Sequence, residues 1–187
     1  MVYIYNKNMD KSMHEINWWR DFYKKNRDRF YGIRLDDFIR TSRFFPEIKD
    51  EVGTGLDYGC GLLSMLEFSE KEFDAIDPLV DSYREMLELG DNYSLDTNKK
   101  YDWVWCINVL DHTETPEILI KDIKKKLKKG GRLYLEVNFD DSLGACHYEL
   151  YNKDKVNGLV NLKKEYEHEF RNEPDKQTLY YAKYIKV

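Results

Sequence analysis

Gly53-Thr-Gly-Leu-Asp57-Tyr-Gly59-Cys-Gly61 is the most informative segment of this 187-residue sequence, and an apolar run follows it directly. The β-prone residues that lead into this segment predict a strand, and the glycines two residues apart predict a tight loop. The apolar residues that follow at helical spacing predict a helix over Leu62–Ser69. Glycine at 59 and 61 permits positive φ and lets a ligand approach the main chain, while a helix start offers free N–H groups. We therefore predict a loop that cradles a nucleotide-type ligand.

Two acidic residues narrow the chemistry of that ligand. Asp57 ends the predicted strand, where its carboxylate repels a pyrophosphate but attracts a ligand that carries an ammonium or sulfonium charge. Asp77 ends the next short strand, over 73–76, and lies 20 residues after Asp57. An acid at this position can bind both hydroxyls of a ribose. The same spacing serves dinucleotides, so an NAD-dependent oxidoreductase stays open as an alternative.

Composition and charge favour one cytoplasmic domain. The chain has 30 Lys+Arg against 35 Asp+Glu, a formal net charge of −5. Because no global basic field exists to attract phosphates, we expect no nucleic-acid partner. The three cysteines, Cys60, Cys106 and Cys146, form no C-x-x-C pair, which suits a reducing compartment. The sequence has neither a signal core nor an apolar run of membrane-spanning length, so we expect no membrane association.

The N-terminal region is dense in aromatic and charged side chains over residues 13–45. Aromatic rings recur at roughly helical intervals from Trp18 to Phe30, which predicts amphipathic helices over 13–30 and 34–44. These rings can pack the helices onto the sheet edge, or they can form a lid over a substrate. The two interpretations are compatible, because aromatic side chains can close a pocket while anchored in a core.

Strands and helices alternate through the middle of the chain. The predicted elements after Asp77 are, in order, a helix over 80–90, a vestigial third strand within 91–100, a strand over 101–110, a helix from Pro116 and a strand over 132–138. This alternation predicts parallel strand pairing with right-handed crossovers. Two β-prone runs at 162–170 and 178–187 then predict an antiparallel C-terminal hairpin.

Taken together, these pieces resemble a class I S-adenosylmethionine-dependent methyltransferase over roughly residues 52–187. The resemblance is carried by Leu56-Asp-Tyr-Gly-Cys-Gly61, by Ile76-Asp77-Pro78, and by Tyr101-Asp-Trp-Val-Trp-Cys-Ile-Asn-Val-Leu-Asp-His112 with Leu127-Lys-Lys-Gly-Gly-Arg-Leu133. It implies an α/β, Rossmann-like fold: a mostly parallel seven-stranded sheet with an antiparallel last strand and helices on both faces. We expect a single domain over 1–187, with a helical lid or cap at 1–50 and the core at 51–187.

The resemblance implies S-adenosyl-L-methionine as the cofactor. By position, the methionyl end would be held by Asp57, Tyr58, Gly59, Cys60 and Gly61, the ribose by Asp77 with Pro78, and the sulfonium by main chain from Cys106 to Asn108. The sequence departs from the family pattern in two places. Leu63 replaces a frequent glycine, and the shortened 91–100 segment leaves Asp91 and Asp96 as alternatives for the adenine contact.

Methyl transfer mainly requires alignment of the reactants and removal of a proton from the acceptor, and it needs no metal. His112 follows the fourth strand and His147 follows the fifth, both at the carboxyl edge where ligands bind in such sheets. Either is a candidate base, and a helix-capping or buried neutral histidine is the alternative for each. Asp140 and Asp141 are candidates for orienting the base or binding substrate.

The acceptor expected from the resemblance is a small molecule. Val137-Asn-Phe-Asp-Asp141 with His147-Tyr148 is similar to a subset of small-molecule and polysaccharide-cluster methyltransferases, so we expect O-methylation of a sugar or related hydroxylated metabolite. A catalytically silent methyltransferase-like subunit and the NAD-dependent oxidoreductase are the alternatives. The sequence makes no prediction of oligomeric state.

Overall fold

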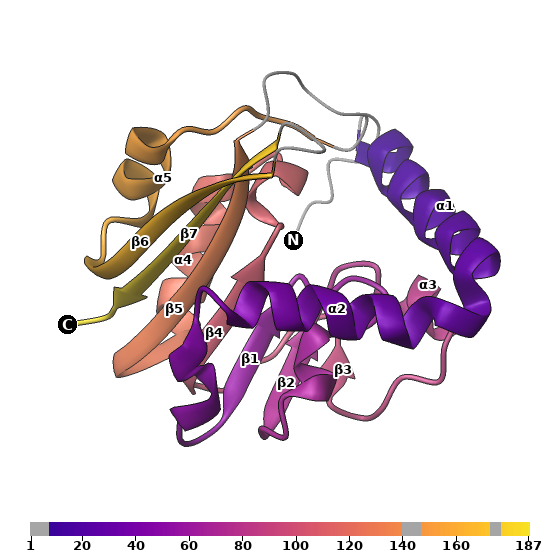
Figure 1. The fold of residues 1–187 in the computed structure, drawn as a ribbon, viewed down its shortest axis with the longest axis horizontal. Helices are drawn as coiled ribbons and strands as arrows, with labels where there is room; N and C mark the ends of the chain where they lie inside the picture. The colour runs from indigo at the N-terminus through magenta and orange to yellow at the C-terminus, as the bar shows by residue number, and fades with distance from the viewer. Residues whose placement is uncertain (1–7, 140–146, 173–176) are drawn as a thin grey trace.

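The computed structural model describes residues 8–139, 147–172 and 177–187, which are organised around one seven-stranded sheet (Figure 1). Its strands are β1 (Gly55–Tyr58), β2 (Phe73–Ile76), β3 (Tyr93–Ser94), β4 (Tyr101–Ile107), β5 (Leu127–Phe139), β6 (Lys163–Asn172) and β7 (Gln177–Ile185). The α-helices are α1 (Asn8–Asn26), α2 (Phe30–Ser42), α3 (Val80–Arg84), α4 (Pro116–Lys126) and α5 (Lys153–Val160). Asp140 and Asp141, the candidates for orienting the base or binding substrate, lie outside the described residues, as does Cys146.

The strand order is β3-β2-β1-β4-β5-β7-β6. Strands β1 to β5 pair in parallel, whereas β7 runs antiparallel to both β5 and β6. The predicted α/β fold, with its mostly parallel sheet and C-terminal hairpin, is therefore confirmed. The third strand is only two residues long, as the polar 91–100 segment predicted.

Helices cover both faces of the sheet because the central strand is apolar on both sides. Successive residues of β4 point to opposite faces. On one face, Trp103 and Trp105 belong to a buried cluster that also contains Phe45, the residue just before the 3-10 helix η2 (Pro46–Asp50). Val104 and Cys106 belong to the cluster beneath α4 and α5. This two-sided burial explains the continuous apolar run at 101–107.

The prediction of a helix over Leu62–Ser69 is wrong. The structure has only the 3-10 helix η3 (Met65–Phe68) in that stretch. The Ser64 hydroxyl donates a hydrogen bond to Asp57 at 2.5 Å and accepts one from the Leu66 N–H at 3.0 Å. These two bonds fix the chain in a tight turn, so the glycine loop does not lead into an α-helix start.

Other helix boundaries also differ from the predictions. The helix predicted over 80–90 is confined to Val80–Arg84, and α5 was not anticipated. Two N-terminal helices are present, but α1 begins at Asn8 and the break falls at the 3-10 helix η1 (Arg27–Arg29). No described helix is long and apolar enough to cross a membrane.

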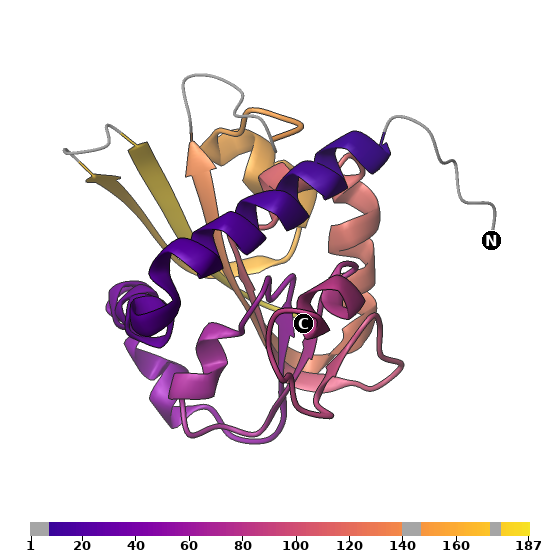
Figure 2. The same ribbon diagram turned by 90° about the vertical axis from the view of Figure 1, so that its right-hand side faces the viewer.

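Helix α1 is tied to segments that follow two different strands, and the side view shows it crossing in front of the sheet (Figure 2). The Lys11 Nζ donates to the His147 carbonyl oxygen at 2.9 Å, in the segment after β5. The Tyr83 hydroxyl, in α3 after β2, donates to a Glu15 carboxylate oxygen at 3.4 Å. The helix thereby lies over the edge at which the parallel strands end.

Candidate cofactor and acceptor site

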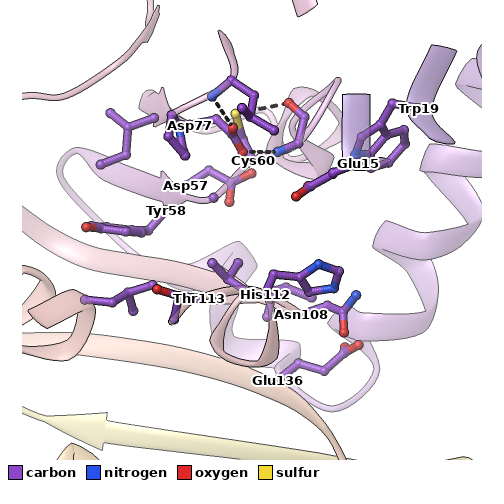
Figure 3. A pocket seen from close by; sticks show the side chains of 18 of the residues that line it. Glu15, Trp19, Asp57, Tyr58, Cys60, Asp77, Asn108, His112, Thr113 and Glu136 are labelled. Atoms are coloured by element: carbon purple, nitrogen blue, oxygen red, sulfur yellow. Dashed lines mark hydrogen bonds between the residues drawn. The ribbon is translucent and has the colours of Figure 1, made fainter. Parts of the chain in front are cut away.

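A cavity of about 2150 Å³ lies at the carboxyl edge of the sheet, lined by the glycine loop, the ends of β1, β2, β4 and β5, and helices α1 and α2. Pockets for one small ligand usually measure about 300–1,000 Å³, so this cavity has room for a cofactor and part of an acceptor. Figure 3 shows Asp57, Cys60 and Asp77 on one wall, Asn108, His112 and Glu136 on the facing wall, and Glu15 and Trp19 of α1 at one end.

The glycine loop needs both of its glycines. Gly59 has φ 77° and Gly61 has φ 63°, a region that residues with a side chain rarely adopt. A Cβ added at Gly59 would lie 2.6 Å from Val109, and one added at Gly61 would lie 3.0 Å from the Trp19 ring. The main chain therefore packs closely against Val109 at Gly59 and against Trp19 at Gly61.

Asp57 lies at the end of β1 and lines the cavity, although only 3% of the residue is exposed. Burial raises the pKa of its carboxyl to about 7, against the hydrogen bond from Ser64 and the charge of Arg34, which lower it. A cation placed beside this group would favour its charged form.

Asp77 is held by two backbone donors. Its Oδ2 accepts a hydrogen bond from the Gly61 N–H at 3.0 Å, and its Oδ1 accepts one from the Leu79 N–H at 2.8 Å. Burial raises the pKa of Asp77 to about 6, although both of these donors lower it. The carboxylate is thus fixed between the loop and the start of α3, with lone pairs left for the hydroxyls of a ribose.

Glu15 is a site residue that the sequence interpretation missed. Burial, followed by the charge of Asp77, raises the pKa of its carboxyl to about 7. Glu15, Asp57 and Asp77 come from α1, β1 and the end of β2, so carboxyl groups from three different elements line one cavity. No local motif marks Glu15, because its place depends on how α1 packs. The concentration of carboxyl groups suits a ligand that carries positive charge.

The remaining predicted cofactor residues divide into two groups. Tyr58, Cys60, Pro78 and Asn108 line the cavity. Cys106 instead lies fully buried in the core cluster beneath α4. Cys60 and Cys106 are both free thiols, and burial raises the pKa of each, so neither is an activated nucleophile.

The two acids considered for the adenine contact also differ. Asp96 lines the cavity and accepts a hydrogen bond from the Lys126 ammonium at 2.6 Å. Asp91 is exposed and does not belong to the described lining.

The structure brings the two candidate bases together. The His112 and His147 rings lie 4.9 Å apart, edge to face, and both line the cavity. The Nε2 of His147 lies 3.5 Å from Oδ2 of Asp111, a 1% exposed residue that the sequence interpretation did not single out. A carboxylate beside an imidazole can orient a general base. Ligand atoms of these three residues lie within 4.8 Å of one another, so the cluster could also hold a metal ion.

Polar side chains continue along the facing wall. Glu136 of β5 is 2% exposed, and Arg40 of α2 lies 3.4 Å from its carboxylate. Arg40 also donates to the Tyr181 hydroxyl at 2.7 Å, and the Thr41 hydroxyl donates to Glu136 at 3.1 Å. This network fixes α2 to β5 and β7 at the rim of the cavity.

A family model described as a methyltransferase domain matches residues 23–179. Curated relatives include the tRNA U34 carboxymethyltransferase of Nautilia profundicola, 26% identical over 165 residues, which cover 78% of this chain and 55% of that protein. The enzyme of the same name from Campylobacter concisus is 27% identical over 152 residues, covering 72% and 52%. The chain therefore spans about half the length of these curated relatives.

Solved structures share the fold. The N-methyltransferase NodS from Bradyrhizobium japonicum, in complex with S-adenosylhomocysteine, matches with a TM-score of 0.60 and 17% identity, covering 84% of this chain and 87% of that one. The 1,6-didemethyltoxoflavin-N1-methyltransferase of Burkholderia thailandensis, also with S-adenosylhomocysteine, matches with a TM-score of 0.67 and 12% identity, covering 100% and 93%. Both ligands agree with the predicted cofactor.

These relatives correct two predictions. The expected small-molecule acceptor and the expected absence of a nucleic-acid partner are contradicted, because the curated relatives are named as tRNA-modifying enzymes. Net charge is a sum over the whole chain, so it does not report how charge is distributed near one cavity. The family match confirms the predicted methyltransferase family in place of the oxidoreductase. The chain belongs to the methyltransferase domain family.

Proposed function

We propose that this chain is an S-adenosylmethionine-dependent methyltransferase that acts on tRNA. The observation that carries the cofactor assignment is the meeting of Glu15, Asp57 and Asp77 around the glycine loop. S-adenosylmethionine supplies a methyl group on a positively charged sulfur when it is bound. Asp77 is placed to bind the ribose hydroxyls, and Asp57 and Glu15 to balance the positive charges of the ligand.

The tRNA assignment is supported by the names of the curated relatives and by local charge. Lys24, Lys25, Arg27 and Arg29 are all exposed, at the end of α1 and in η1. Helix α1, which carries Lys24 and Lys25, also lines the cavity, and Arg27 and Arg29 follow it directly in the chain. A phosphate backbone can be bound by such a local group of cations even when the whole chain carries a net negative charge.

The histidine pair is proposed to remove the acceptor proton. Asp111 is placed to orient the His147 imidazole, and His112 stands beside it on the cavity wall. An imidazole can accept a proton at neutral pH, and a neighbouring carboxylate stabilises the imidazolium that results. Helix α1 is proposed to be part of an N-terminal cap, within residues 1–50, that encloses the reactants.

The test is transfer of a radioactive methyl group. The purified chain is incubated with S-adenosylmethionine labelled in its methyl group and with total tRNA, and the counts in RNA are measured before and after ribonuclease digestion. We expect incorporation that ribonuclease removes and that Asp77→Ala reduces. The relatives are named carboxymethyltransferases, and a carboxymethyl group is heavier than methyl, so mass spectrometry of the nucleosides checks that the added mass is that of one methyl group. Equal counts for wild type and a blank would overturn the proposal.

A further inference from the structure

Two asparagine side chains meet where the central strands end at the cavity. Asn108 directly follows β4, and Asn138 lies in β5, one residue before its end. The Asn138 Nδ2 donates a hydrogen bond to the Asn108 Oδ1 at 2.5 Å. Both residues line the cavity. Because the amide oxygen of Asn108 faces Asn138, the hydrogen bond fixes the orientation of the Asn108 amide and directs its two N–H groups elsewhere.

The backbone of Asn108 adopts an uncommon conformation. Asn108 has φ 56°, in the left-handed region, where asparagine is tolerated better than most residues but strain is still stored. The Asn138 Oδ1 is buried and has no hydrogen-bond partner among the residues that the structure describes. The Asn108 backbone N–H already bonds to the Glu136 carbonyl at 3.0 Å, so the strands are joined without the side chains. Strain and an unmatched buried amide are typical of a binding site rather than of a structural tie.

The amide of Asn108 is available to a ligand. Asn108 is exposed, and it stands on the wall opposite the carboxyl groups of the cofactor half (Figure 3). Trp18 of α1 lines the same cavity with 50% of the residue exposed, and it stacks on Phe22 with ring centroids 5.0 Å apart. A half-exposed indole is a surface on which a nucleobase can stack. The cavity volume leaves room for such a base beside the cofactor.

We infer that Asn108, oriented by Asn138, is the residue with which this cavity distinguishes a uracil base from a cytosine base. The inference rests on the proposed tRNA-modifying function. Uracil carries a carbonyl oxygen at the position where cytosine carries an amino group. The fixed N–H groups of Asn108 can donate a hydrogen bond to that carbonyl. With cytosine they would face an amino group, which is also a donor, and no hydrogen bond would form. Enzymes that act on an extruded base use such hydrogen bonds together with stacking.

Two isosteric substitutions test this assignment. Asn108→Asp keeps an acceptor for Asn138 but presents an oxygen to the base instead of N–H groups. Asn138→Asp removes the donor that orients Asn108, so the Asn108 amide is free to turn its oxygen toward the base. Both variants should therefore lose the preference for uracil or shift it toward cytosine. Gln177→Glu is the matched control, because Gln177 also lines the cavity but lies on β7.

Two measurements are made on each variant. The first is calorimetric binding of uridine and cytidine monophosphates in the presence of S-adenosylhomocysteine. The second is methyl transfer to a tRNA transcript with uridine at position 34 and to the same transcript with cytidine there. We expect wild type and Gln177→Glu to favour uridine about tenfold or more in both measurements. We expect the two asparagine variants to reduce that ratio to about one or below.

The outcomes separate the inference from the proposed function. If wild type methylates the uridine transcript but Asn108→Asp and Asn138→Asp keep its uridine-to-cytidine ratio, the inference is overturned and the proposed function stands. If wild type methylates neither transcript, the proposed function fails. The ratio of the affinities for uridine and cytidine monophosphates then tests the inference, which is overturned if wild type binds the two nucleotides equally well.

Discussion

The Asp77 carboxylate accepts a hydrogen bond from the Gly61 backbone N–H at 3.0 Å, which joins the end of β2 to the loop that follows β1. In the proposed site this one side chain has two tasks, because it fixes the glycine loop and is placed to bind a ribose. Asp77→Ala should weaken binding of S-adenosylhomocysteine by about 1–3 kcal/mol, the usual cost of an unmatched polar partner. Calorimetry measures the loss, with Asp91→Ala as the control. Unchanged affinity in Asp77→Ala would remove the ribose assignment.

The buried carboxyl groups should make the stability of the ligand-free protein depend on pH. Burial raises the pKa of Asp57 to about 7 and that of Asp77 to about 6. Below about pH 4 these carboxyl groups are protonated in both the folded and the unfolded protein, and their contribution to the free energy of unfolding is fully present. As the pH rises toward 7, the unfolded chain loses its protons first, so the folded state binds more protons and the contribution is lost.

We therefore expect these carboxyl groups to lower the free energy of unfolding as the pH rises from about 4 to about 7. Urea denaturation of wild type and Asp57→Asn at several pH values measures the effect. The amide cannot ionise, so the variant should lose part of the pH dependence. The same slope in both proteins would show that Asp57 is already charged in the folded state.

Replacing the proposed base should reduce turnover without weakening cofactor binding. His112→Gln or His147→Gln should lower turnover by about a hundredfold or more, because loss of a general base typically has that effect. Affinity for S-adenosylhomocysteine should stay nearly constant. His14→Gln is the control, since His14 lines the same cavity outside the histidine pair. Near-full turnover in both His112→Gln and His147→Gln would exclude histidine base catalysis.

The proposed cap should become more protected when the site is filled. Glu15 and Trp19 of α1 line the cavity, and Lys11 ties the helix to the segment after β5. We expect slower amide hydrogen exchange over residues 13–45 when S-adenosylhomocysteine and tRNA are added together, since closure lowers local opening. Exchange in α5, which packs beneath the other face of the sheet, should change little. No change over 13–45 would limit these helices to a packing role.

Local patterns were enough for much of the fold. The alternation of strands and helices, the vestigial third strand and the C-terminal hairpin follow from periodicity and turn residues, which act over a few neighbours. The same reasoning failed at Leu62–Ser69, where a hydrogen bond between Ser64 and Asp57 holds the chain in a turn. A side-chain bond across seven residues competes with helix formation and leaves no mark in the periodicity.

The glycine loop, Asp57 and Asp77 could be predicted without the structure, because Asp57 lies at the end of one strand, Asp77 follows the neighbouring strand, and these positions depend on short-range order. The side chains that join these residues in the cavity could not be predicted in this way, because they depend on tertiary packing. Glu15 reaches the cavity because α1 packs against α3, and Asn138 meets Asn108 because of the register of β5 against β4. Such contacts join residues far apart in the chain, and they are set by packing of whole elements rather than by local preference.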